Sequence, residues 1–277
     1  MRRAAGACLL TLLLSSALHA LELDGPVVQG GLMFGQAEPG SRVTLDGEPV
    51  MVDDAGRFVI GFGRDETGTR ILEVTPPQGA RERLELAVEP REYDIERVDG
   101  LPPRTVTPDP EAAERIAREA ALVRNARARR DPSAAWAGGF EWPARGRISG
   151  VYGSQRVLNG EPRRPHFGLD IAAPTGSPVV APADGVVTLA HADMYFSGGT
   201  VIIDHGQGLS SSFLHLSEVL VNEGDEVRQG DLIARIGATG RASGPHLDWR
   251  MNWLDRYVDP ALLVPGSPEP DPKPESP

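Results

Sequence analysis

The chain has 277 residues, and its 39 acidic side chains exceed its 28 Lys and Arg side chains, which gives a net charge of −11 at pH 7. Such an acidic chain is not expected to hold nucleic acid or an anionic membrane by charge. The length exceeds what a single small hydrophobic core requires, so we expect more than one domain.

Residues 1–20 have the layout of a signal peptide. Arg2 and Arg3 precede a short apolar run, and a small-residue cleavage site ends at Ala20. The run is too short to span a bilayer stably, so we expect export to the periplasm or cell envelope and no stable membrane insertion after cleavage; a membrane anchor is the alternative. Cys8 is the only cysteine, so a metal site in the mature chain would have to use His and carboxylate ligands.

Residues 21–90 are expected to form a small β-sandwich. Short runs of strand-forming residues alternate with turn signals, of which Asp46-Gly47 is the strongest hairpin signal. The spacing of these runs is typical of a sandwich. This part of the chain contains neither His nor Cys, so a structural role and a ligand-binding role both remain open.

Residues 91–137 are interpreted as a linker that contains a helix at about 110–130. Asp109 can cap this helix and Pro110 suits its first position. Arginines crowd its last turns, at Arg124, Arg127, Arg129 and Arg130. They either form a solvated face that complements the helix dipole or contact an acidic polymer.

Residues 138–264 change to short β segments with Gly and Pro at the corners, which predicts a second β-rich domain. The fold class is therefore mainly β. Strands are expected at Ile148–Tyr152, Ser177–Ala181, Gly185–Ala190, Thr200–Asp204, Leu209–Leu216 and Asp231–Ile236. The Pro- and Glu-rich tail, residues 265–277, is expected to be disordered.

Two short motifs in this domain combine His with Asp. His166 and Asp170 would lie about 13 Å apart on a straight strand, so the chain must bend, at Gly168, if they are to share an ion. His246 and Asp248 would point to the same side of a strand, about 6.6 Å apart. His215 lies on an apolar strand, and His191 and His205, beside turn residues, are interpreted as structural.

These motifs occur in a characteristic order: His166-Phe-Gly-Leu-Asp170, then Phe213-Leu-His215, then Gly244-Pro-His246-Leu-Asp248-Trp249. With the intervening Gly- and Pro-rich strands, the region from about Gly146 to Pro260 resembles the lysostaphin-type (LytM, peptidase family M23) zinc endopeptidases. The resemblance implies a β-sheet-rich peptidase domain, a Zn²⁺ cofactor, and peptidoglycan stem or cross-link peptides as the substrate.

Carried over residue by residue, the resemblance makes His166 and Asp170 zinc ligands and His215 and His246 the catalytic pair that orients and deprotonates the attacking water. Asp248 stands at the third ligand position, where the family usually has His. Asp is a legitimate zinc ligand, but a second carboxylate makes the site less positive, so other divalent ions are also possible. The active-site tyrosine of some members has no clear match, and Arg163, Arg164 or Tyr195 are candidates to replace it.

Two alternative functions fit parts of the sequence. A non-catalytic relative that binds peptidoglycan or activates a separate amidase would resemble the same family, but such relatives have generally lost several ligands. Residues 221–237 also resemble a biotinyl or lipoyl carrier hairpin, but a carrier needs a lysine and the only one is Lys273, in the tail. The sequence therefore predicts an exported zinc endopeptidase, and it carries no signal for the oligomeric state.

Overall fold

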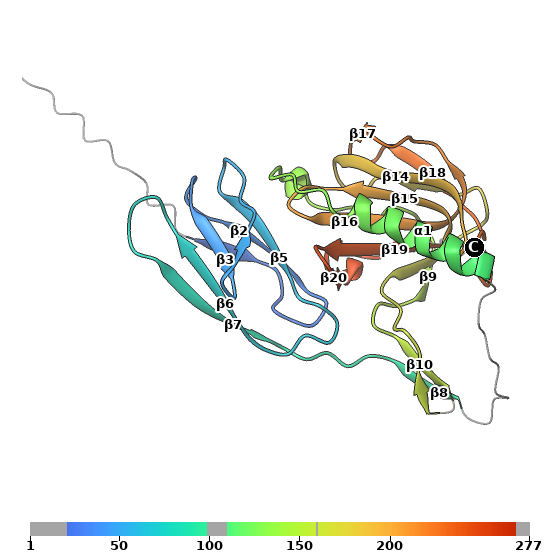
Figure 1. Ribbon diagram of the computed structural model, residues 1–277, viewed down its shortest axis with the longest axis horizontal. Coiled ribbons are helices and arrows are strands. Elements are labelled where there is room, and N and C mark those ends of the chain that lie inside the picture. The colour runs from blue at the N-terminus through green and yellow to red at the C-terminus, as the bar shows by residue number, and fades with distance from the viewer. Residues whose placement is uncertain (1–20, 99–109, 159, 270–277) are drawn as a thin grey trace, which may run out of the picture.

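The computed structural model describes residues 21–98, 110–158 and 160–269 (Figure 1). The predicted signal peptide lies outside these residues, as does the predicted helix cap at Asp109. Within them the chain forms four β-sheets and one α-helix, which confirms the mainly β fold class. No helix in the described ranges is both long enough and apolar enough to cross a membrane.

Two antiparallel sheets make up the N-terminal module, residues 21–90. One sheet has the strand order β1-β2-β5 and the other the order β4-β3-β6-β7. Asp46 and Gly47, at the predicted hairpin, have φ values of 52° and 85°, the two positive angles that a type I′ turn requires. The strands are β1 (Glu22–Asp24), β2 (Leu32–Gln36), β3 (Arg42–Leu45), β4 (Glu48–Val50), β5 (Arg57–Gly61), β6 (Gly68–Thr75) and β7 (Glu82–Val88).

A ten-stranded sheet forms the C-terminal domain. Its main path runs β17-β14-β15-β16-β19-β12-β9, and β13, β18 and β20 attach beside it. The strands are β9 (Arg147–Gly150), β12 (Leu169–Ala172), β13 (Pro178–Val180), β14 (Gly185–Met194), β15 (Gly198–Asp204), β16 (Leu209–Val219), β17 (Glu226–Val227), β18 (Leu232–Ile236), β19 (His246–Trp253) and β20 (Arg256–Val258), with short 3-10 helices η1 (Ala135–Gly138) and η2 (Pro260–Leu262).

The helix α1 (Pro110–Ala126) covers one face of this sheet (Figure 1). Because side chains alternate along a strand, β15 serves two cores. Val201 and Ile203 join the main core, whereas Ile202 packs in a second cluster with Ala126 of the helix. The helix is shorter than the predicted 110–130, because the chain tightens into a turn where the Ala128 N–H donates to the Asn125 carbonyl.

A separate small sheet joins the linker to the C-terminal domain. The linker residues expected as a plain connector contain β8 (Ile95–Val98), which pairs in parallel with β10 (Gln155–Leu158), and β10 forms a hairpin with β11 (Glu161–Pro162). These strands are too short and charged to be recognised from their own residues; β8 is a strand because a partner is available about sixty residues later.

The N-terminal module packs directly against the C-terminal domain. The rings of Phe34 and Trp136 lie 4.8 Å apart, and Arg91 forms an ion pair of 2.8 Å with Asp259. Arg64, which is buried, donates two hydrogen bonds to the Gly153 carbonyl. One continuous hydrophobic core therefore extends through both parts.

Residues 265–269, predicted as part of a disordered tail, are described and contact the domain. The Trp142 indole N–H donates to the Pro265 carbonyl, and the Gly146 N–H donates to the Pro268 carbonyl. These bonds hold the start of the tail against the domain, and residues 270–277 lie outside the described part.

Candidate metal centre and catalytic histidines

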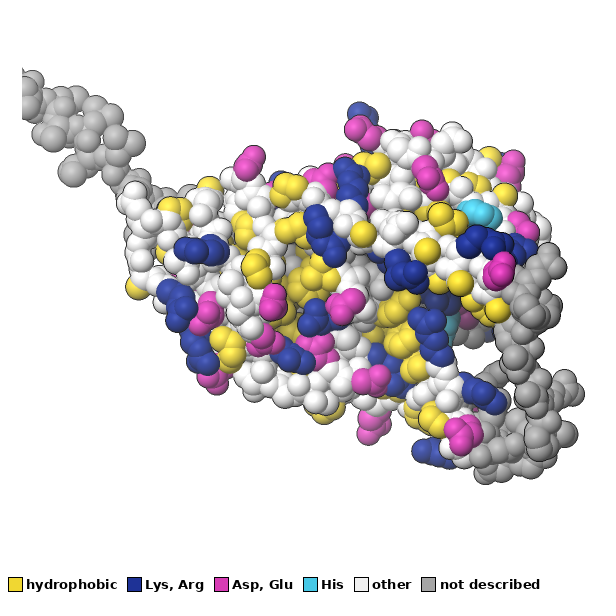
Figure 2. Space-filling view, in the orientation of Figure 1, with side chains coloured by type: hydrophobic (Ala, Val, Ile, Leu, Met, Phe, Trp, Pro, Cys, Tyr) yellow, Lys and Arg dark blue, Asp and Glu magenta, His cyan; other side chains and the backbone are white. Residues whose placement is uncertain are grey.

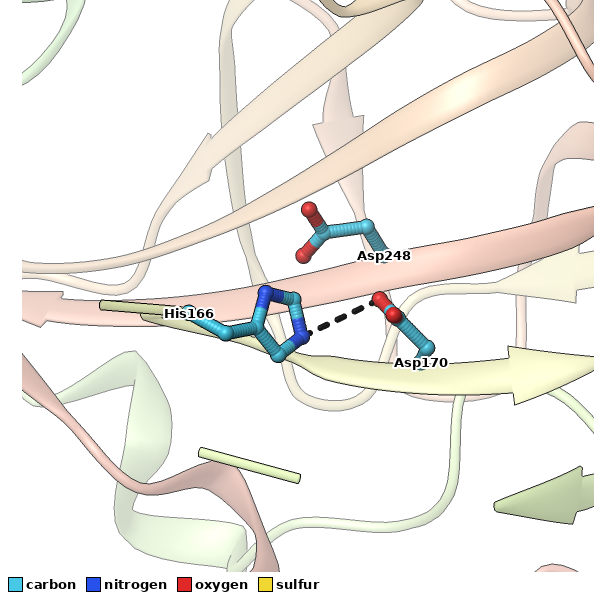
Figure 3. A group of neighbouring side chains, drawn as sticks. All are labelled: His166, Asp170 and Asp248. Atoms are coloured by element: carbon cyan, nitrogen blue, oxygen red, sulfur yellow. Dashed lines mark ion pairs between the residues drawn. The ribbon is translucent and has the colours of Figure 1, made fainter. Parts of the chain in front are cut away.

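Three predicted ligands, His166, Asp170 and Asp248, converge at one point (Figure 3). One ligand atom from each of them lies within 4.8 Å of the other two. Strands β12 and β19 pair antiparallel with Asp170 directly opposite Asp248, which brings the two carboxylates together. His166 lies three residues before β12, and its Nε2 approaches Asp170 Oδ1 of that strand.

His166 is fixed by the hairpin that precedes it. Its N–H donates to the Ser154 carbonyl, and its carbonyl accepts from the Gly153 N–H, at 2.8 Å each. The glycine at 168 has a different role from the predicted bend. Its φ is not in the left-handed region, but a Cβ there would overlap Asp248 Oδ1 and crowd the Arg250 side chain. Gly168 therefore gives Asp248 the space to approach.

The donor atoms fit a metal ion. His166 Nε2 and Asp170 Oδ1 lie 3.1 Å apart, and both are buried without a properly oriented hydrogen bond. Two ligand atoms that share a tetrahedral Zn²⁺ at 2.0–2.2 Å would lie about 3.4 Å apart. The two atoms form an ion pair only when His166 is protonated (dashed line in Figure 3), and with a neutral ring they are costly to bury unless a third group lies between them. A divalent cation bound between these two atoms would satisfy both of them.

Asp248 has a partner that the sequence reasoning missed. Its side chain is almost fully buried, and Arg250 Nε donates to both carboxylate oxygens at 3.0 Å while the guanidinium Nη2 adds a bond to Oδ2. Burial acts to raise the pKa of Asp248, but the Arg250 charge outweighs it and the pKa lies below its usual value. The i, i+2 spacing on β19 was the available signal, because it places both side chains on one face.

This pairing changes the charge of the predicted site. Asp170 and Asp248 together carry −2, and Arg250 returns the total to −1, the same as a set of two histidines and one aspartate. A carboxylate oxygen has two lone pairs, so an ion-paired Asp248 can still bind a metal. The expectation that the second carboxylate makes the site less positive therefore overlooked Arg250.

The predicted catalytic pair lies beside the ligands. The rings of His215 and His246 are 4.8 Å apart between centroids, and His246 Nε2 is 3.9 Å from Asp170 Oδ1. His215 Nδ1 lies 2.8 Å from the Thr239 carbonyl and His246 Nδ1 lies 2.8 Å from the Gly244 carbonyl. A carbonyl only accepts, so both Nδ1 atoms carry the hydrogen and both Nε2 atoms keep a lone pair when the rings are neutral.

His215 also has an unusual backbone. Its φ is 65°, in the left-handed region that residues other than glycine rarely adopt. Such strain persists where the surroundings hold it, and here the His215 N–H donates to the Ser197 carbonyl. Burial lowers the pKa of His215 below its usual value, although the Thr239 bond opposes this. The ring is therefore neutral at pH 7.

The remaining candidates lie elsewhere. His205 is fully buried with both ring nitrogens bonded, and His191 accepts a bond from the Asp193 N–H. Of the three candidates to replace the family tyrosine, Tyr195 packs edge-on against Phe196, Arg163 is exposed, and Arg164 donates to the hydroxyl of Tyr257.

The model of peptidase family M23 matches residues 164–260, which include all five predicted site residues. A crystal structure described as a peptidase M23 from Pseudomonas aeruginosa is 33% identical, with a TM-score of 0.65, and the match covers 86% of this chain and 95% of that one. The chain belongs to peptidase family M23. Two named relatives from other bacteria match shorter parts of the chain.

The cell division protein DipM of Caulobacter vibrioides is 32% identical over 166 residues, which is 58% of this chain and 26% of DipM. The peptidoglycan DD-endopeptidase ShyA of Vibrio cholerae is 41% identical over 95 residues, 34% of this chain and 22% of ShyA. The match therefore spans about a quarter of the length of each of these relatives.

Proposed function

We propose that this M23 member is an exported, zinc-dependent endopeptidase that hydrolyses peptide bonds in the stems or cross-links of peptidoglycan. The observation that carries the proposal is the convergence of His166, Asp170 and Asp248 within 4.8 Å, beside two histidines whose Nε2 atoms remain available. The name of ShyA, a peptidoglycan DD-endopeptidase, supports the substrate class, and the signal-peptide layout supports a periplasmic or envelope location.

The roles of the residues follow from their positions. A Zn²⁺ held by His166, Asp170 and Asp248 would supply Lewis-acid polarisation of the scissile carbonyl. His215, neutral at pH 7 with its hydrogen fixed on Nδ1, presents Nε2 to take a proton from the attacking water. His215 can then pass this proton to the leaving amine, and His246, 4.8 Å away between ring centroids, would stabilise the developing oxyanion when its own Nε2 is protonated.

The test combines metal content with digestion of purified sacculi. Wild type is expected to contain one zinc per chain and to release peptide fragments, and His215→Ala is expected to keep the zinc but release none. His191→Ala, which changes a histidine away from the site, serves as the control and should match wild type. A wild-type chain that binds zinc but leaves sacculi intact would refute the hydrolase.

A second candidate function is a non-catalytic regulator that activates a separate amidase. It is favoured by the ion pair of Asp248, whose two oxygens both accept from Arg250. If that pair excludes the metal, wild type should contain no bound zinc, release no fragments by itself, and increase fragment release by an added amidase. Bound zinc lost on Asp248→Ala would exclude this reading.

A further inference from the structure

The polar face of β19 continues past the metal ligands. Asp248 is followed on the same face by Arg250, and Ser212 of β16 lies directly opposite Arg250. Two residues along a strand correspond to about 6.6 Å, the span of about two residues of an extended peptide. A peptide held by the metal centre would therefore place groups next to the scissile bond near Arg250 and Ser212.

Two further arginines meet at this end of the face, from opposite directions. Arg127 follows the end of α1, and Arg164 precedes His166 on the hairpin side. Both donate to the Tyr257 hydroxyl at 3.2 Å, and Arg127 also donates to Ser212 Oγ at 2.9 Å. Figure 2 shows Lys or Arg side chains on both sides of a recess in this face, between the helix and the small hairpin sheet.

The two guanidinium groups have no carboxylate partner. Neighbouring arginines do: Arg250 pairs with Asp248, and Arg129 with Asp131. Among residues 21–98, 110–158 and 160–269, no ion pair reaches Arg127 or Arg164, and Arg127 Nε is buried without an acceptor. Two cations thus converge on one neutral oxygen, in a chain whose net charge is −11.

The phenol is a poor counterpart for this charge. A hydroxyl that accepts from two guanidinium groups must place its own hydrogen elsewhere, and no acceptor for it lies among the described residues. Burial acts to raise the pKa of Tyr257, but the charges of Arg127, Arg164 and Arg250 outweigh it and hold the pKa below its usual value. The surroundings therefore favour an anion at this point.

We propose that Arg127, Arg164 and Tyr257 form a binding site for a carboxylate of the substrate peptide, one that lies within about two residues of the bond to be cut. Guanidinium forks match a planar carboxylate with two parallel hydrogen bonds, and the Arg164 side chain is exposed while that of Arg127 is half-buried. This inference depends on the proposed function only in taking the bound peptide to be a peptidoglycan peptide. It would act on specificity: substrates that carry the carboxylate bind, and amidated ones bind weakly.

The experiment measures binding by calorimetry with the full chain carrying His215→Ala, so that bound peptide is not cleaved. The probes are a peptidoglycan tetrapeptide with free carboxylates, the same peptide with a C-terminal amide, and the same peptide with the diamino acid carboxylate amidated. We expect one of the two amides to bind roughly tenfold more weakly than the free acid. Which amide loses affinity identifies the carboxylate, and equal binding of all three overturns the proposal.

Variants assign the effect to the named residues. In this background R127Q/R164Q should bind the acid and the amides equally, whereas R124Q/R163Q, which removes two exposed arginines close to them in sequence, should keep the tenfold difference. Tyr257→Phe keeps the ring that stacks on Phe167 at 4.6 Å but frees both arginines, so it should bind the acid at least as tightly as the unchanged tyrosine does. Persistent discrimination in R127Q/R164Q contradicts the proposal, as does competition by inorganic phosphate that exceeds competition by the acid peptide.

Failure of this site can be separated from failure of the proposed function. R127Q/R164Q should retain the zinc content of its parent, because neither arginine is among the metal ligands. If wild type does not digest sacculi but the acid–amide difference is present, the hydrolase fails and the carboxylate site stands. If wild type digests sacculi but the difference is absent, only the carboxylate site is refuted.

Discussion

Two regions of the C-terminal domain hold histidines in the same way and use them differently. His215 and His246 at the candidate metal centre, and His205 just after β15, each direct Nδ1 to a backbone carbonyl at 2.7–2.8 Å. At His205 the second nitrogen, Nε2, bonds Ser211 Oγ at 2.7 Å, and the ring packs edge-on against Phe140. Among the described residues, no hydrogen bond reaches Nε2 of His215 or His246.

The hydrogen-bonding state of Nε2 is what distinguishes these histidines. The carbonyl at Nδ1 fixes the ring and its tautomer in all three cases, so anchoring does not distinguish a catalytic histidine from a structural one. The state of the other nitrogen does. A satisfied Nε2 in a fully buried ring indicates a structural role, whereas an available Nε2 beside carboxylates indicates proton transfer.

The largest effect is expected at the proposed metal ligands. Asp248→Ala should abolish zinc binding, because it leaves only two protein ligands and also leaves Arg250 without its carboxylate. Zinc per chain, measured by elemental analysis, should fall to background, and sacculus digestion with it. Asp255→Ala, at an exposed carboxylate, is the control; zinc retained in Asp248→Ala would place the third ligand elsewhere.

Alanine substitutions of His246 and His205 test this difference between the two kinds of histidine directly. His246→Ala should lower the rate of peptide release from sacculi by about 10²–10⁴-fold, the usual contribution of a positioned acid or base, and leave the melting temperature nearly unchanged. His205→Ala should do the reverse, with a lower melting temperature and a near-normal rate for the folded fraction. Equal effects of the two on rate would show that Nε2 availability has no functional meaning.

The Asp248–Arg250 pair gives an intermediate effect. Asp248→His restores the ligand type usual in the family but leaves Arg250 unpaired beside the metal, so zinc affinity should fall by roughly 10–100-fold, the range for the loss of an outer partner of a metal site. In Asp248→His with Arg250→Gln the unpaired cation is gone, and affinity should recover most of the loss. Competition with a zinc chelator measures both, and no recovery in the double variant would show that Arg250 does not balance Asp248.

The effect with the least bearing on activity is on stability at low pH. Burial lowers the pKa of His205 to about 4, against 6.5 for the exposed side chain. Between pH 6.5 and 4 the unfolded chain takes up a proton that the folded chain refuses, so the free energy of unfolding should fall by about 3 kcal/mol as the pH decreases through this window. His205→Gln should remove that component from the pH dependence of denaturant unfolding, and His191→Gln should keep it.

The candidate site residues could largely be predicted from the alternation of residues along single strands. The long-range contacts that hold these residues in place could not. The alternation along His246–Trp253 places Leu247 and Trp249 in the core and leaves His246 and Asp248 on the other face, which period-two reasoning gives. The pairing of β8 with β10 depends on a partner far along the chain. The positive φ of His215 is set by the Ser197 carbonyl, and nothing in its local sequence encodes it.

The parallel pairing of β8 with β10 has a practical consequence for anyone who wishes to shorten or transplant this enzyme domain. The hairpin that holds His166 has one edge closed by a strand that precedes the helix, so excision at residue 138 would leave that edge bare and prone to self-association. A shortened chain that keeps the domain should therefore begin before Ile95. A chimeric protein should include β8 and α1 together with the domain.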